Sequence, residues 1–138
     1  MKRLSCINKA FVFFVAAGIS FVSSANADQF TQSDLDAWEA EYKKAVKEGR
    51  KHFTDGNLGS NGLACAQCHP NAANTHPETY PKFQKQLGKV VTIGEMINWC
   101  IRNPLEGKNL ALDSKKMVSI IAYTTEERRK VKLDPGKH

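Results

Sequence analysis

The chain lacks several patterns that mark common classes of protein. After residue 27, apolar and polar residues nowhere alternate convincingly as in half-buried strands, so helices and loops are expected instead of a large sheet. There is no internal repeat, and no histidine stands in the serine or carboxylate arrangement of a hydrolase. The charge pattern does not favour nucleic acid as a partner. Without these patterns, the sequence is best interpreted as a small helical domain with few residues able to carry out chemistry.

The long apolar run of the chain lies at its N-terminus. Lys2, Arg3 and Lys9 surround its start, residues 10–22 are almost wholly apolar, and an Ala-x-Ala pattern ends at Ala27. The pattern predicts a signal peptide over residues 1–27, too short to span a bilayer, and a mature domain over 28–138 in the periplasm or an equivalent exported compartment. Cys6 would leave with the signal peptide. Cleavage would lower the formal net charge from +6 to about +3, because the signal carries three basic residues and no acid.

Five consecutive residues carry most of the chemistry. Cys65-Ala66-Gln67-Cys68-His69 has the C-x-x-C-H spacing at which two thiols bond the vinyl groups of haem c and the histidine binds its iron. A redox C-x-x-C or half of a zinc site are the alternatives, but the βαβ pattern expected around a redox motif is missing. We therefore predict one haem c, attached through Cys65 and Cys68, with His69 as an axial ligand.

The apolar spacing predicts an all-α fold, a class I cytochrome c-like single domain around one covalently bound haem. Segment 70–89 is expected to be a loop. The predicted helices run from Ser33 to about Phe53, from a Thr92–Glu95 capping box to Asn103, and from an N-cap at Asp113 to about Glu126, with Leu112 and Met117 as a hydrophobic staple.

The residues themselves leave the second axial ligand open. Class I cytochromes place a methionine in the loop before the last helix, but loop 103–112 contains none. Met96 and Met117 occur at helical core spacing, and packing is their simpler role. His76 precedes a proline in a polar loop and is expected to be solvent-exposed. A plain His/Met electron carrier, with Met117 or Met96 as ligand, is therefore one hypothesis.

Cys100 is the other candidate, since it has no partner among the remaining cysteines. It shares a helix face with Ile93 and Ile97, and these side chains, with Met117, are expected to line a haem pocket. A buried thiol, an intermolecular disulfide and a metal ligand are all open for Cys100. As a thiolate ligand it would stabilise ferric over ferrous iron and lower the reduction potential.

A family resemblance favours the ligand. Residues 97–108 (INWCIRNPLEGK), followed by LALDSKKM at 110–117, resemble a segment of the SoxA-type cytochromes and of the first haem domain of thiosulfate dehydrogenases. In those families the cysteine matching Cys100 is the distal haem ligand, opposite the C-x-x-C-H histidine. The resemblance therefore implies ligation of the haem iron by His69 and Cys100.

The chain also resembles the small subunits of the anammox cytochrome complex NaxLS, which pair with one another and bind nitric oxide or carbon monoxide. The resemblance implies a non-enzymatic, low-potential cytochrome for electron transfer or diatomic gas binding. It also implies a redox partner protein and a dimer, either with another small cytochrome or with a second copy. A haem subunit of a sulfur-oxidising enzyme is the main alternative.

Two surface features bear on such partners. Trp38, Tyr80 and Trp99 are candidates for a contact surface, although Trp38 is expected to pack in the core with the apolar face of its helix. The basic cluster at 128–132 is expected to be a solvated tail, and its alternative is a docking surface for an acidic partner.

Overall fold

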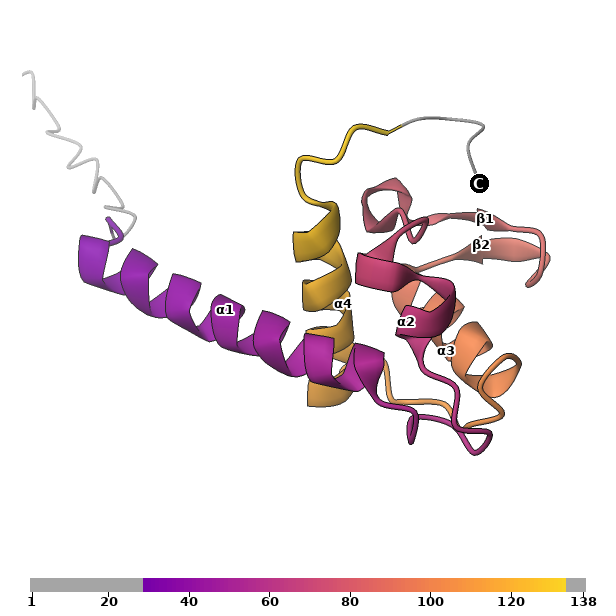
Figure 1. The fold of residues 1–138 in the computed structure, drawn as a ribbon. Helices are drawn as coiled ribbons and strands as arrows, with labels where there is room; N and C mark the ends of the chain where they lie inside the picture. Colours follow the sequence, from indigo (N-terminus) through magenta and orange to yellow (C-terminus); the bar gives the residue numbers. More distant parts are fainter. Residues whose placement is uncertain (1–28, 134–138) are drawn as a thin grey trace, which may run out of the picture.

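A computed structural model describes residues 29–133, so the predicted signal peptide, Cys6 and His138 lie outside the described residues. The chain is mostly helical, as predicted (Figure 1). Two single 3₁₀ turns, Pro70–Ala72 and Pro77–Thr79, follow the C-x-x-C-H motif. The longer elements are α1 (Gln32–Thr54), α2 (Cys65–Cys68), β1 (Lys82–Gln84), β2 (Lys89–Val91), α3 (Ile93–Arg102) and α4 (Lys115–Arg128). Within residues 29–133, no helix combines the length and apolar character that crossing a membrane requires.

Helix α1 starts one residue before the predicted Ser33, because Thr31 is its N-cap. The Thr31 hydroxyl accepts a hydrogen bond from the Asp34 backbone N–H at 3.2 Å, and the Asp34 carboxylate accepts one from the Thr31 N–H at 2.8 Å. The two bonds form a capping box that satisfies end groups of the helix. The Thr31 hydroxyl also donates a 2.6 Å hydrogen bond to the Asp34 carboxylate, and this bond, with the one from the Thr31 N–H, holds the pKa of Asp34 below its ordinary value.

The N-terminal half of α1 extends beyond the other helices (Figure 1). Every residue from 29 to 41 is exposed, including Leu35, and Trp38 retains 51% of its accessible surface. The Trp38 ring meets that of Phe30 edge to face, with ring centroids 4.8 Å apart. The prediction that Trp38 packs in the core is therefore wrong. Its apolar stripe is continuous in sequence, but the rest of the domain covers only the second half of the helix.

That second half packs against α4. Gly49 is buried at the contact, and a Cβ atom at this position would lie 1.8 Å from the Ser119 carbonyl oxygen. Beside it, the rings of Phe53 and Tyr123 lie 5.1 Å apart and form part of the core with Ile120. The close approach of the two backbones thus requires glycine at position 49.

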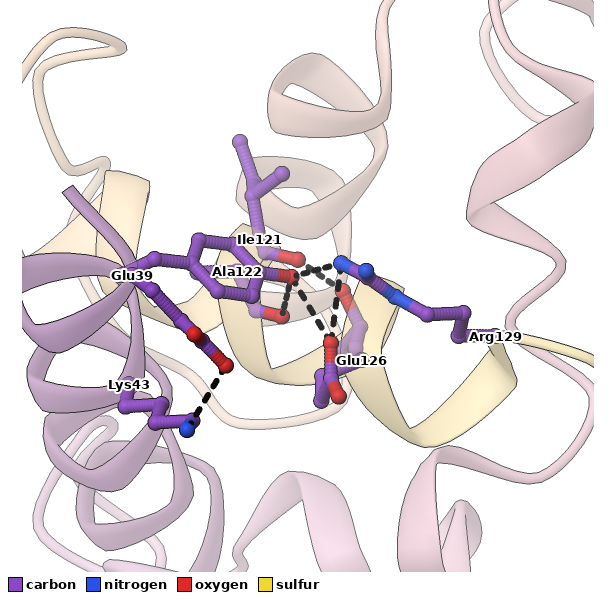
Figure 2. Close-up of polar contacts among 8 residues, drawn as sticks. Glu39, Lys43, Ile121, Ala122, Glu126 and Arg129 are labelled. Atoms are coloured by element: carbon purple, nitrogen blue, oxygen red, sulfur yellow. Dashed lines mark hydrogen bonds and ion pairs between the residues drawn. The ribbon is translucent and has the colours of Figure 1, made fainter. Parts of the chain in front are cut away.

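Polar contacts extend the α1–α4 contact towards the C-terminal end of α4. Arg129 pairs with Glu126 at 2.9 Å, and on α1 Lys43 pairs with Glu39 at 2.7 Å (Figure 2). Arg129 also donates a 2.9 Å hydrogen bond to the Tyr42 hydroxyl, which lies 3.2 Å from a Glu126 carboxylate oxygen. One member of the basic cluster is therefore bound to α1, and the predicted solvated tail starts beyond it.

The capping box predicted for α3 is present. The Thr92 hydroxyl accepts from the Glu95 N–H at 3.3 Å, and the Glu95 carboxylate accepts from the Thr92 N–H at 2.8 Å. The N-cap of α4 is Ser114 instead of the predicted Asp113, and its hydroxyl accepts from the Met117 N–H at 3.2 Å. Met117 is fully buried, but Leu112 is 51% exposed. The predicted hydrophobic staple between the two residues is therefore wrong for Leu112.

An antiparallel hairpin, β1–β2, occupies part of segment 70–89, which was predicted to be loop. Phe83 pairs with Val90, and both face solvent, 63% and 64% exposed. Lys82 and Gln84, on the opposite face of β1, are partly buried. In β1 the polar side chains thus face inwards and the apolar one outwards, the reverse of the usual pattern, whereas Val91 of β2 is buried in the usual way. The reversal in β1 explains why segment 70–89 showed no strand signal.

Candidate functional site

A cavity of about 580 Å³ lies between the helices and the hairpin, within the size range of cofactor sites. One wall is largely apolar and comes from α1, α3, α4, the residue before α2 and the loop after α3. It includes Phe53, Ala64, Ile93, Met96, Ile97, Trp99, Leu105 and Ile120. The other wall is polar and comes from a single segment. It consists of Asn74, Thr75, His76, Tyr80, Lys82, Gln84 and Gln86.

The three residues of the haem motif line this cavity. Helix α2 holds Cys65 and Cys68 one turn apart, and His69 follows as its C-cap. The His69 Nδ1 atom lies 2.8 Å from the Ala73 carbonyl oxygen. Because a carbonyl oxygen can only accept, Nδ1 carries the proton of this bond and Nε2 keeps its lone pair for a metal. The local backbone therefore fixes the imidazole tautomer that an axial haem ligand needs.

Cys100 lines the same cavity from α3, together with Ile93 and Ile97. Burial raises the pKa of the Cys100 thiol, and the nearby Cys68 adds to the rise. Burial likewise raises the pKa of Cys65 to about 11. The fold thus brings Cys100 to the two thiols of the motif, and burial keeps the Cys65 and Cys100 thiols protonated in the chain without haem.

The other predicted candidates separate clearly. Met96 lines the cavity, whereas Met117 is completely buried and is not among the lining residues, so Met117 packs between helices. His76 was expected to be solvent-exposed, and that is wrong: it lines the cavity and its side chain is 21% exposed. Its Nδ1 lies 3.2 Å from a Glu78 carboxylate oxygen, which orients the ring. The backbone of His76 is left-handed, with φ +46°, and this turns the loop into the cavity wall.

Tyr80, which the sequence offered as a contact-surface residue, is half-buried in the cavity wall. Gln84 donates a hydrogen bond to its hydroxyl, and the Lys82 ammonium lies 4.6 Å from the centroid of its ring. Burial raises the pKa of Tyr80, and a thiolate at Cys100, which lines the same cavity, would raise it further. The Tyr80 hydroxyl is therefore part of the environment of Cys100.

Asn98 is a structural residue of the site that the sequence reading missed. It is 6% exposed on α3; its amide donates to the Leu110 carbonyl at 2.9 Å, and its carbonyl accepts from the Leu110 N–H at 2.8 Å. An amide side chain on the buried face of an otherwise apolar helix is the signal that could have revealed it. These two bonds tie the loop before α4 to the helix that carries Cys100.

We expect Asn98→Ala to lower the free energy of unfolding by about 2–4 kcal/mol, because two partly buried backbone groups of Leu110 lose their partners at about 1–2 kcal/mol each. Chemical denaturation of the ferric protein, followed by circular dichroism, measures the change. Asn103→Ala is the matched control, since Asn103 is exposed and makes a single side-chain bond, 2.8 Å to the Trp99 carbonyl. Equal effects of the two substitutions would show that the hydrogen bonds between Asn98 and Leu110 contribute no more to stability than the exposed bond of Asn103.

The cavity and its thiols are explained by comparison with known proteins. Residues 48–133 match the family described as SoxA/TsdA, cytochrome c domain. The chain belongs to this family. The mostly helical structure and the match together confirm the predicted class I cytochrome c-like fold, and membership means that the chain carries covalently bound haem c. Its general role is that of a haem protein of electron transfer.

Similar proteins include three thiosulfate dehydrogenases. The one from Allochromatium vinosum is 28% identical over 58% of this chain, that from Psychrobacter arcticus 36% over 49%, and that from Stutzerimonas stutzeri 28% over 60%. The matched regions are 36%, 23% and 31% of those proteins. The chain therefore spans well under half the length of these relatives and corresponds to part of each.

Proposed function

We propose that this protein is an exported monohaem cytochrome c, mature from about residue 28, in which His69 and Cys100 ligate the haem iron at low reduction potential. The observation that carries the proposal is the single cavity shared by Cys65, Cys68, His69 and Cys100, with the His69 Nδ1 proton engaged by Ala73. The donor set is the one that a haem c with a thiolate ligand needs. The amphipathic walls also suit an apolar macrocycle with an acidic edge.

Each of these residues has a distinct task. Cys65 and Cys68 would hold the haem through two thioethers, each equivalent to addition of an S–H bond across a vinyl double bond without loss of an atom. His69 supplies Nε2 and Cys100 supplies its sulfur, while Ile93 and Ile97 exclude water beside Cys100. When bound, the haem supplies one reversible electron transfer between ferric and ferrous iron. The protein would pass this electron to a redox partner protein in the periplasm or an equivalent compartment.

A small neutral ligand is compatible with the same surroundings. Ile93, Met96 and Ile97 present apolar side chains around Cys100, and none of them can hydrogen-bond strongly to water. We therefore propose that the haem can also bind nitric oxide or carbon monoxide. We further propose that the protein pairs with another small cytochrome or with a second copy of itself. Trp38, which is half exposed, is available to such a partner.

The similarity to thiosulfate dehydrogenases favours a second candidate, the haem subunit of a sulfur-oxidising enzyme. The two candidates are separable because thiosulfate would reduce the ferric haem of such a subunit, alone or with its partner. Ferric protein that stays oxidised in excess thiosulfate, yet is reduced by a low-potential donor, would favour the electron carrier. Reduction coupled to loss of thiosulfate would favour the enzyme subunit.

The proposal is tested by mass and spectrum. We expect the mature chain to begin near Asp28 and to carry the mass of one haem, and we expect its ferric form to show the low-spin EPR signature of a thiolate ligand. The reason is that Cys100 is the thiol of the cavity left over after two thioethers form. A near-infrared charge-transfer band typical of thioether ligation would instead identify Met96 as the ligand. A chain without haem would refute the proposal altogether.

A further inference from the structure

The reversed polarity of strand β1 requires an explanation. A strand that buries Lys82 and Gln84 while exposing Phe83 loses apolar burial and desolvates polar groups. Such an arrangement is stable when the polar face meets a polar or charged partner. Lys82, Gln84 and the neighbouring Tyr80 all line the 580 Å³ cavity, so that partner belongs inside the cavity.

The charge of the cavity defines the partner as an anion. Lys82 is the single lysine or arginine among the lining residues, and no aspartate or glutamate of residues 29–133 is among them. Within the same part of the chain Lys82 forms no ion pair, whereas Lys89 on the adjacent strand is paired with Glu95 at 2.8 Å. The ammonium of Lys82 is therefore available to a carboxylate or another oxyanion.

The donors around Lys82 are already oriented. Its ammonium lies over the Tyr80 ring, 4.6 Å from the centroid, and Gln84 donates to the Tyr80 hydroxyl. Because Gln84 donates in this bond, the Tyr80 O–H is left to donate elsewhere. The Lys82 ammonium on β1 and the Tyr80 hydroxyl just before it together form a small preorganised oxyanion site. This site lies at the polar end of an otherwise apolar cavity.

We propose that Lys82 and Tyr80, held by Gln84, form the site that binds a propionate carboxylate of the haem. The inference rests on haem occupying this cavity, as in the proposed function. It assigns the hairpin a role: the apolar wall from the helices receives the macrocycle, and the polar wall from segment 74–86 receives its acidic edge. The ligand chemistry is an oxyanion, and the alternative source is a free inorganic anion.

Lys82→Gln tests the assignment. We expect the propionate bending bands in the resonance Raman spectrum to shift, because these bands report hydrogen bonding to the propionates. We also expect the midpoint potential to fall, since loss of a cation stabilises the more positive ferric haem. Lys85→Gln is the matched control: Lys85 has the same charge in the same hairpin but is exposed and absent from the cavity wall. It should leave the bands unchanged.

Tyr80→Phe separates binding from a general charge effect. It removes no charge, so a through-space effect of Lys82 alone predicts no change in the propionate bands of this variant, whereas a propionate bound by both groups predicts a shift. Titration with sulfate addresses the other source of oxyanion. A saturable response to sulfate that disappears in Lys82→Gln would overturn the propionate assignment, and absence of any response is expected.

Failure of the propionate site can be distinguished from failure of the proposed function. If the wild-type chain carries haem c but Lys82→Gln and Tyr80→Phe leave the propionate bands in place, the hairpin site is wrong while the cytochrome stands. If the wild-type chain carries no haem, the proposed function itself fails. Measuring the haem content of every variant first distinguishes these two cases.

Discussion

Cys100→Ala should raise the midpoint potential of the haem by on the order of a few hundred mV, within the ~0.8 V range over which axial ligands set haem potentials. Thiolate donates negative charge to the iron and stabilises the ferric state, so that its removal favours reduction. Haem attachment should survive, because Cys65, Cys68 and His69 lie on a separate element from Cys100. Potentiometric titration of the purified variant measures the shift, and an alkaline pyridine haemochrome spectrum measures the attachment.

Two further variants make the result specific. Cys100→Met offers a thioether at the same position and should also raise the potential while keeping the ferric iron low-spin, if its sulfur reaches the iron. Met96→Leu is the control, since Met96 lines the same cavity and is the competing sulfur. A potential that moves with Met96→Leu and stays constant with Cys100→Ala would identify a His/Met carrier. Cys100 would then be a core thiol.

The parts of the structure that follow local rules were predictable from sequence. The Thr92–Glu95 capping box appears as expected because its two bonds join residues three apart, and neither depends on the rest of the fold. The C-x-x-C-H turn is predictable for the same reason. The Ser114 cap is one residue from the predicted Asp113, which is the usual error where two capping residues are adjacent.

The features that depend on tertiary neighbours were missed. Trp38 has the periodicity of a core residue, but periodicity cannot show that its helix extends beyond the part of the domain that covers it. Strand β1 has reversed polarity, since Lys82 faces a cavity, and a strand signal assumes that apolar side chains face inwards. His76 looked exposed because its polar neighbours gave no sign that a left-handed residue turns the loop back.

In the candidate site, too, local features were predictable from sequence and features that depend on tertiary packing were harder to predict. Cys65, Cys68 and His69 are contiguous, so their common location was certain from the motif. The presence of Cys100 in the same cavity depended on how α3 packs, and the shared face with Ile93 and Ile97 was enough to predict it. Lys82 and Tyr80 had no such signal, because a single lysine and a single tyrosine in a polar stretch resemble ordinary surface residues.

The remaining large effect concerns the contact between α1 and α4. Gly49→Ala should lower the free energy of unfolding by about 3 kcal/mol, at the upper end of the ~1–3 kcal/mol typical of overpacked cores. A Cβ atom there would lie 1.8 Å from the Ser119 carbonyl oxygen and 2.5 Å from its carbonyl carbon, both of which belong to the backbone. No rotamer change can relieve that overlap, so the two helices must separate, and the rings of Phe53 on α1 and Tyr123 on α4 would lose contact with each other.

Gly94→Ala is the matched control, because it makes the same substitution in another helix. Its Cβ would lie 3.1 Å from the end of the Leu112 side chain, which is half exposed and free to move. Alanine also has the better helix propensity by about 1 kcal/mol, so the net change at Gly94 should be close to zero. Guanidinium unfolding of both ferric variants, with haem content matched, measures the difference. Equal stabilities would show that α1 and α4 tolerate a wider separation than Gly49 indicates, and the core around Phe53 would then be looser than its burial implies.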